Sequence, residues 1–225
     1  MPAPTCLVLP GFLDPAGGTA LHALAECLVT VGMTVVADDP RGTWSSPGTP
    51  ADLAPTVQLA DIAREIDTRP ADRVVLVGHC YGAYLAMLAA ARDDRVTDVV
   101  AIMPTRCFIW PDDYTPARDT WRAAGNKLFL RTAGGERRTF AVPYSVVEDA
   151  VTHDLPTAVG QLRQRILFVA GEHDRVIGVE PVRKLHEECG SPDNTLAVLP
   201  VWHDYRDEPE QIEIVNRRIM SWLGG

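Results

Sequence analysis

Short runs of apolar residues alternate along the chain with longer stretches in which apolar residues recur every three or four positions. The short runs predict six β-strands, at residues 5–9, 33–37, 73–77, 96–103, 164–170 and 194–199. The longer stretches predict helices at residues 19–31, 56–67, 83–91, 180–189 and 208–223. Because apolar strands that alternate with helices form parallel sheets, the pattern predicts an α/β fold with a mostly parallel sheet and helices on both faces.

This alternation is interrupted between the fourth and fifth predicted strands. Residues 107–161 hold seven of the chain's fifteen aromatic residues. We interpret them as a helical lid inserted into a core formed by residues 1–106 and 162–225; a peripheral subdomain with its own small core is the alternative. Four of these aromatic residues are expected to line an apolar substrate pocket: Trp110, Tyr114, Trp121 and Tyr144.

Composition narrows the classes of partner and cofactor. The 225 residues carry a formal net charge of −9 without a Lys- or Arg-rich run, which does not favour nucleic acid or an anionic membrane as a partner. No apolar run approaches the roughly 20 residues that span a membrane, and no signal peptide is visible. The five cysteines form no CxxC pair, and neither metal-ligand spacing nor a dinucleotide or phosphate-loop motif is present. We therefore expect a reduced, cytoplasmic protein with no metal and no cofactor.

One short motif carries most of the chemical information. Gly78, His79, Cys80, Tyr81 and Gly82 lie between a predicted strand and a predicted helix. Strand, tight turn and helix form the context of a nucleophile elbow, in which the central residue has a strained backbone and flanking glycines leave room for neighbouring chain. The central residue is usually serine; here it is cysteine.

The central cysteine is predicted to have two partners further along the chain. Cys80, Asp174 and His203 each follow a predicted strand, and the carboxyl ends of parallel strands meet at one edge of a sheet. A helix N-terminus and a nearby imidazolium favour the thiolate, His203 can accept and return the proton, and Asp174 can orient His203. Glu172 and Asp204 are competing acids, but the GxxD motif after the penultimate strand favours Asp174.

Other polar residues near these motifs are interpreted as structural. His79 is expected to pack beneath the sheet, and Arg106 to be solvated or structural rather than to meet a substrate carboxylate. Asp38 and Asp39 are expected to hold a loop or the lid.

Taken in order along the chain, these motifs resemble the α/β-hydrolase family. The matching pieces are residues 9–12, 39–42, 78–82 and 171–174, followed by His203. The resemblance covers nearly the whole chain, in a form that lacks the family's first two strands. It implies that the backbone amides of two residues stabilise an oxyanion: Phe12 and Tyr81. A Cys-Asp-His triad is similar to that of dienelactone hydrolases and some thioesterase-like enzymes.

Three explanations of the cysteine remain open. If the thiol is the natural nucleophile, the protein is a hydrolase or acyltransferase that forms an acyl-Cys80 intermediate. The second explanation is a Ser→Cys replacement that slows deacylation. The third is a C–O lyase that eliminates an acyl group such as acetate in natural-product tailoring.

The balance of charge in the insertion bears on the substrate. Residues 107–161 hold six Lys or Arg and seven Asp or Glu, so we expect a small, uncharged and fairly apolar ester, lactone or thioester as the partner. A non-catalytic binding protein is the alternative from another class, and a homodimer is compatible with the sequence.

Overall fold

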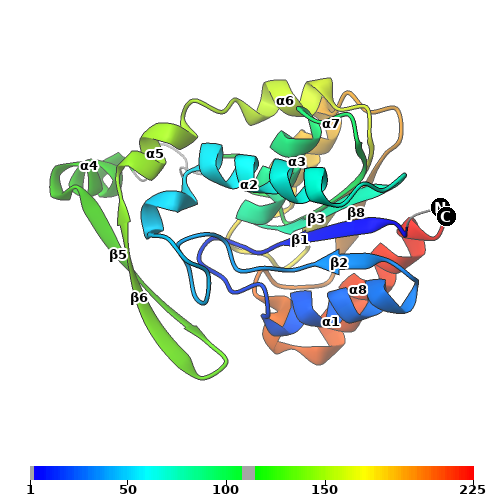
Figure 1. Ribbon diagram of the computed structural model, residues 1–225, viewed down its shortest axis with the longest axis horizontal. Helices are drawn as coiled ribbons and strands as arrows, with labels where there is room; N and C mark the ends of the chain where they lie inside the picture. The colour runs from blue at the N-terminus through cyan, green and yellow to red at the C-terminus, as the bar shows by residue number, and fades with distance from the viewer. Residues whose placement is uncertain (1–2, 108–114) are drawn as a thin grey trace.

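The computed structural model describes residues 3–107 and 115–225, and its centre is a six-stranded parallel sheet (Figure 1). The strands lie in the order β2-β1-β3-β4-β7-β8. Their bounds are β1 (Thr5–Leu9), β2 (Thr34–Val36), β3 (Val74–His79), β4 (Val96–Ile102), β7 (Arg165–Gly171) and β8 (Asn194–Leu199). The predicted α/β architecture is thereby confirmed.

Helices cover both faces of this sheet, as expected for strands that are apolar throughout. On one face α1 (Thr19–Thr30) and α8 (Pro209–Leu223) pack against side chains such as Val75 and Val77. On the other face, Val74 and Leu76 pack in a second cluster beneath further helices. These helices are α2 (Pro55–Thr68), α3 (Tyr81–Ala90) and α7 (Val179–Glu188). The alternation of β3 side chains between two buried clusters explains why this strand has no polar face.

Helix α3 is the most enclosed helix of this second face. All ten of its residues are buried, because it packs on β3 and β4 and beneath α2 and α6 (Leu155–Gln161). Its small side chains, among them Ala83, Ala86 and Ala90, allow this close approach to the sheet.

The insertion between β4 and β7 contains a β-hairpin as well as helices, so the prediction of a purely helical lid is wrong in this respect. Its elements are α4 (Thr115–Ala124), β5 (Asn126–Ala133), β6 (Glu136–Pro143), α5 (Ser145–Ala150) and α6. Gly134 and Gly135 both have positive φ, 56° and 80°, as a two-residue hairpin turn requires. The hairpin extends as an arm at one side of the molecule (Figure 1). Its function as a lid stays a prediction.

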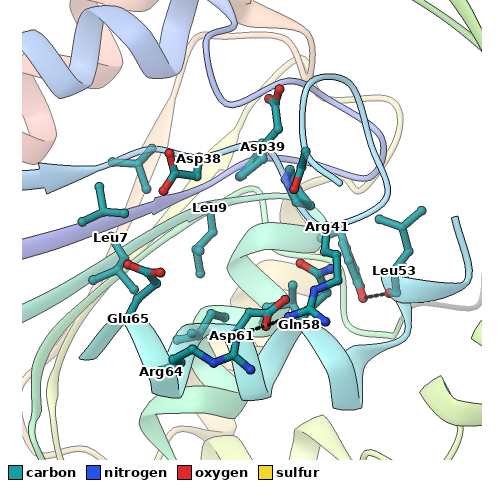
Figure 2. A pocket seen from close by; sticks show the side chains of 18 of the residues that line it. Leu7, Leu9, Asp38, Asp39, Arg41, Leu53, Gln58, Asp61, Arg64 and Glu65 are labelled. Atoms are coloured by element: carbon teal, nitrogen blue, oxygen red, sulfur yellow. Dashed lines mark hydrogen bonds and ion pairs between the residues drawn. The ribbon is translucent and has the colours of Figure 1, made fainter. Parts of the chain in front are cut away.

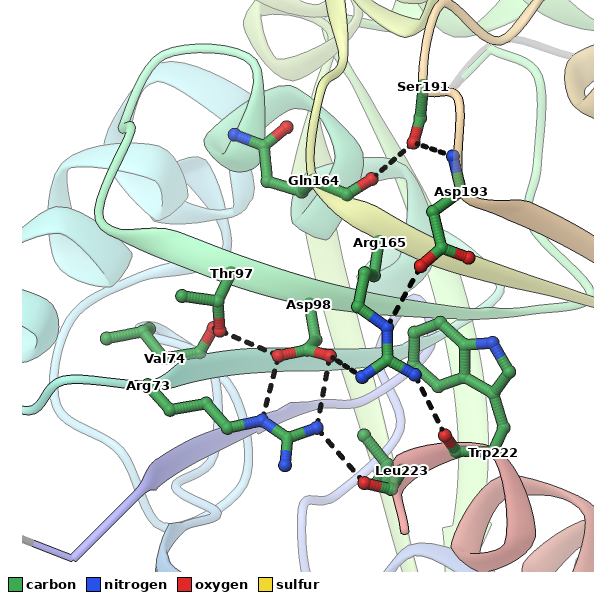
Figure 3. Close-up of polar contacts among 10 residues, drawn as sticks. All are labelled: Arg73, Val74, Thr97, Asp98, Gln164, Arg165, Ser191, Asp193, Trp222 and Leu223. Atoms are coloured by element: carbon green, nitrogen blue, oxygen red, sulfur yellow. Dashed lines mark hydrogen bonds and ion pairs between the residues drawn. The ribbon is translucent and has the colours of Figure 1, made fainter. Parts of the chain in front are cut away.

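An ion-pair network stabilises the end of the sheet at which the parallel strands begin (Figure 3). The buried Asp98 carboxylate on β4 accepts two hydrogen bonds from Arg73, at 2.9 and 3.1 Å, and lies 3.2 Å from Arg165 Nη1. Arg73 also donates to the carbonyl of Leu223, and Arg165 to that of Trp222. The network therefore joins three strands to the end of α8.

Within the described residues, no helix has the length and apolar character needed to cross a bilayer.

Candidate active site

The turn between β3 and α3 has the geometry expected of a nucleophile elbow. Cys80 has φ 53° and ψ −110°, a conformation that is strained for a residue with a Cβ atom. Its amide donates to the carbonyl of Ile102 on β4 at 2.9 Å, and its carbonyl accepts from the amide of Tyr84 at 3.2 Å. The strained turn is therefore held from both the sheet and the helix.

The two glycines of the elbow are required by close backbone packing. A Cβ atom on Gly78 would lie 2.3 Å from the backbone of Gly82. A Cβ atom on Gly82 would lie 2.1 Å from the carbonyl oxygen of Leu9, at the end of β1. The spacing GxCxG thus follows from the contact between the elbow and β1.

Asp174 and His203 form a hydrogen-bonded pair beside this elbow. Asp174 follows β7 and His203 follows β8, and Asp174 Oδ2 lies 2.9 Å from His203 Nδ1. The other carboxylate oxygen, Oδ1, accepts from the backbone amides of Val176 at 2.7 Å and Ile177 at 2.9 Å. Burial alone would raise the pKa of Asp174, but the hydrogen bond and charge of His203, together with these amides, lower it. Asp174 therefore remains a carboxylate that can orient and stabilise an imidazolium.

His203 connects this acid to the cysteine. Burial would lower the pKa of His203, but hydrogen bonds to Asp174 and Cys80 and the charges of those two groups raise it to about 10. Cys80 is partly exposed, so a substrate can reach it. The structure thus brings together the three residues that the sequence singled out, in the arrangement that a nucleophile, a base and an orienting acid would require.

The two competing acids, Glu172 and Asp204, are not the partners of His203. Glu172 is exposed, and Asp204 pairs with Arg206 at 2.6 Å. Arg106 makes a two-pronged ion pair with Glu188, at 2.9 and 2.8 Å, which supports its structural interpretation.

The two predicted oxyanion residues lie on adjacent segments. Tyr81 is the first residue of α3, and Phe12 follows the turn after β1. Their rings meet edge to face, with centroids 5.9 Å apart. The Tyr81 hydroxyl donates to the carbonyl of Leu53 at 2.7 Å, which fixes this side chain away from the elbow backbone.

The hairpin reaches this region through an aromatic residue that the sequence analysis did not single out. The ring of Phe129 on β5 lies edge to face on Phe12, with centroids 5.3 Å apart, and 5.5 Å from the ring of Trp121. Trp121 in turn lies 6.1 Å from Tyr144. The two expected pocket residues Trp121 and Tyr144 therefore belong to an aromatic chain that ends at Phe12. The inward position of Phe129 in an alternating strand was the available sequence signal.

Trp110 and Tyr114, the other two expected pocket residues, lie outside the described residues. In residues 3–107 and 115–225, no group of three or more His, Cys, Asp or Glu side chains is arranged to hold a metal ion.

Comparison with known proteins places this site in a family. The model of the alpha/beta hydrolase family matches residues 6–215. The chain belongs to the alpha/beta hydrolase family. Within the described residues β2 is an edge strand of the sheet, and no strand pairs with its outer side.

Individual relatives differ in how much of the chain they cover. The thiohydrolase apmlB of Arthrinium phaeospermum is 33% identical over 108 residues, which cover 45% of this chain and 35% of that protein. The chain thus spans about a third of this relative's length.

Two solved alpha/beta hydrolase structures show the same fold at low sequence identity. A monoacylglycerol lipase of Paleococcus ferrophilus is similar at a TM-score of 0.79 and 20% identity, over 99% of this chain and 96% of that chain. Est1E of Butyrivibrio proteoclasticus with bound ferulic acid is similar at a TM-score of 0.76 and 20% identity, over 99% and 88%.

The contact between His203 and Cys80 predicts a reactive thiol. Iodoacetamide should label Cys80 rapidly near neutral pH, because an adjacent imidazolium stabilises the thiolate that reacts. The variant His203→Ala should slow this labelling at least about ten-fold, whereas His22→Ala, at an exposed position of α1, should leave it unchanged. The rate is measured by mass spectrometry of the Cys80 peptide. Slow labelling that does not depend on His203 would contradict the prediction and favour a non-catalytic binding protein.

A second histidine, His79, lies next to His203. The buried His79 ring lies 4.9 Å from the ring of His203 and 5.7 Å from that of Tyr205, and its Nε2 has no hydrogen-bond partner in the described part of the chain. Burial, reinforced by the charge of His203, lowers the pKa of His79 to about 4. His79 is therefore neutral when His203 is charged, in agreement with its predicted structural role.

Acidification is expected to destabilise the protein through His79. The ordinary pKa of 6.5 applies in the unfolded chain, whereas the folded protein resists protonation until about pH 4. Between these two pKa values the unfolded state binds more protons than the folded state. The free energy of unfolding therefore decreases as the pH is lowered, by up to about 3 kcal/mol. Urea denaturation at pH 7 and at about pH 4.5 should show a smaller loss in His79→Gln than in the wild type. Equal losses would contradict the prediction.

Proposed function

We propose that the protein is a hydrolase or acyltransferase of the esterase or thioesterase type. Its substrate would be a small, fairly apolar carboxylic ester, lactone or thioester, and Cys80 would carry the acyl group as a covalent intermediate. The observation that supports this most directly is the hydrogen bond between Asp174 and His203 beside an elbow whose backbone holds Cys80 in place, with Cys80 close enough to raise the pKa of His203. The resemblance to a thiohydrolase supports thioesters as one substrate class.

The first half-reaction uses proton transfer between Cys80 and His203. His203 takes the thiol proton, and Cys80 Sγ attacks the substrate carbonyl carbon to form a tetrahedral intermediate. By resemblance to the family, the amides of Phe12 and Tyr81 would donate hydrogen bonds to its oxyanion. As the carbon–oxygen or carbon–sulfur bond to the leaving group breaks, His203 returns the proton to the leaving group and acyl-Cys80 remains.

The second half-reaction removes the acyl group. His203, held by Asp174, takes a proton from water or from another acceptor, which attacks the thioester carbonyl and restores the Cys80 thiol. Water gives hydrolysis and an alcohol, amine or thiol gives transfer, so the same residues serve both outcomes.

Intact-protein mass spectrometry tests the proposal. The protein is incubated with matched acetyl and butyryl esters and thioesters, and Cys80→Ala serves as the control. We expect turnover together with a mass increase equal to the acyl group, located at Cys80 and absent from the variant. Product formed by elimination without an adduct would support the lyase alternative instead. The absence of both adduct and turnover across the series, with the thiol accessible to iodoacetamide, would contradict the proposal.

A further inference from the structure

A second cavity lies away from the triad, between the carboxyl ends of β1 and β2 and the helix α2 (Figure 2). We call it the α2 pocket. Its volume is about 480 Å³, which is within the range of pockets that bind small organic molecules. None of Cys80, Asp174 and His203 lines it. The pocket therefore needs an explanation of its own.

One part of the α2 pocket is apolar. Strands β1 and β2 and helices α2 and α3 contribute aliphatic side chains to its wall: Leu7, Leu9, Val36, Ile62 and Leu85. Such a wall can bury the hydrocarbon body of a ligand.

The polar part of the pocket presents hydrogen-bond acceptors. Gln58 is only 6% exposed, and its Nε2 donates to the carbonyl of Asp52 at 2.7 Å. This bond fixes the amide group, and Gln58 points from α2 into the pocket (Figure 2). Within the described residues, neither Gln58 Oε1 nor the carboxylate of Asp38 has a hydrogen-bond donor. Gln58 Oε1 is therefore accessible from the pocket to a ligand that donates a hydrogen bond.

The charges around the pocket favour a cation. Four carboxylates line it, from Asp38, Asp39, Asp61 and Glu65, against two guanidinium groups.

Both of those guanidinium groups are already engaged. Arg41 and Arg64 both pair with Asp61, the latter at 2.6 Å. Glu65 pairs with Arg69, which lies outside the lining. The negative charge left without a cationic partner among the described lining residues is therefore that of Asp38 and Asp39. A cationic ligand is favoured at the side of the pocket formed by these two residues.

We propose that the α2 pocket binds a small amphipathic amine. Its ammonium group donates to Gln58 Oε1 in the field of Asp38 and Asp39, and its apolar body lies against Leu9 and Ile62. The site does not depend on the proposed acyl chemistry. Its inner wall includes Pro10, Gly11 and Tyr81, so an occupant touches both segments that carry the predicted oxyanion amides.

Three probes of nearly equal size and different charge test the proposal. These are 2-phenylethylamine, 2-phenylethanol and phenylacetate, titrated into the full chain by calorimetry and followed by NMR chemical shifts. We expect the amine to bind most tightly and phenylacetate most weakly. Failure of the amine to bind at ~10 mM, or equal binding of the three probes, would overturn the proposal.

Variants locate the binding. Gln58→Leu should weaken the amine about ten-fold by removing a hydrogen bond to a charged group, and Asp38→Asn about three-fold, because Asp38 is exposed. Ile62→Trp should abolish binding by filling the pocket. Glu26→Gln, an exposed acidic position on α1, is the matched control and should have no effect. Amine binding that persists in both Ile62→Trp and Asp38→Asn would place it elsewhere and overturn the proposal.

Discussion

Replacing Cys80 with alanine is expected to lower kcat/KM for an ester or thioester substrate by at least about a thousand-fold. The reason is that alanine removes the atom that attacks the carbonyl in the proposed mechanism, while it leaves the predicted oxyanion amides and His203 in place. Because alanine has the same backbone requirements as cysteine at φ 53°, the elbow itself should be preserved. The measurement is the steady-state rate with the ester and thioester series, together with circular dichroism to verify the fold.

Two further variants make this result specific. Cys27→Ala, at a half-buried position of α1, should retain full activity and excludes a general effect of losing a thiol. Cys80→Ser keeps a nucleophile at the elbow and should retain more activity than Cys80→Ala. Turnover by Cys80→Ala at a rate near that of the wild type would show that the reaction does not pass through acyl-Cys80.

Replacing Asp98 with alanine is expected to be the most destabilising change outside the elbow. Asp98 is almost fully buried, and its carboxylate faces both Arg73 and Arg165. Without it, two partly buried guanidinium groups lose their shared partner, which costs about 3 to 5 kcal/mol of unfolding free energy. For a chain of this size that corresponds to a drop in Tm of roughly 6 to 15 °C.

An exposed ion pair provides the comparison for Asp98. Asp67 pairs with Arg95 at 2.7 Å at the surface, and Asp67→Ala should cost less than about 1 kcal/mol. Urea denaturation of both variants measures the difference. A cost for Asp98→Ala no larger than that for Asp67→Ala would mean that the network at the start of the strands does not hold α8 to the sheet.

The core strands were predictable because each contains a short run of apolar, mostly β-branched or aliphatic residues, even where a polar residue such as Asp98 interrupts it. The predicted strands at residues 5–9 and 194–199 coincide with β1 and β8, and the others differ from the structure by at most two residues at either end. Cys80, Asp174 and His203 each follow the carboxyl end of a strand. These ends meet at one edge of a parallel sheet, so the parallel topology alone was enough to bring the three residues together.

The insertion was less predictable for a physical reason. Its hairpin interrupts short apolar runs with basic residues such as Lys127, Arg131 and Arg138, and its aromatic residues suggested a pocket more strongly than a strand. The pair Gly134 and Gly135 was the missed signal for a tight turn. Contacts such as that between Phe129 and Phe12, and the α2 pocket itself, join segments far apart in sequence, and a single sequence contains no direct sign of them.

The complete burial of α3 has a consequence for how this protein could acquire new substrates. Because every residue of the helix behind Cys80 is buried, the sulfur that the proposed mechanism uses would have almost no freedom to shift toward a larger or smaller acyl group. Adaptation must therefore come from the other wall, where Phe129 and Trp121 approach Phe12. Directed evolution for altered acyl preference should accordingly concentrate its library on the hairpin and α4, and leave the scaffold under the sulfur untouched.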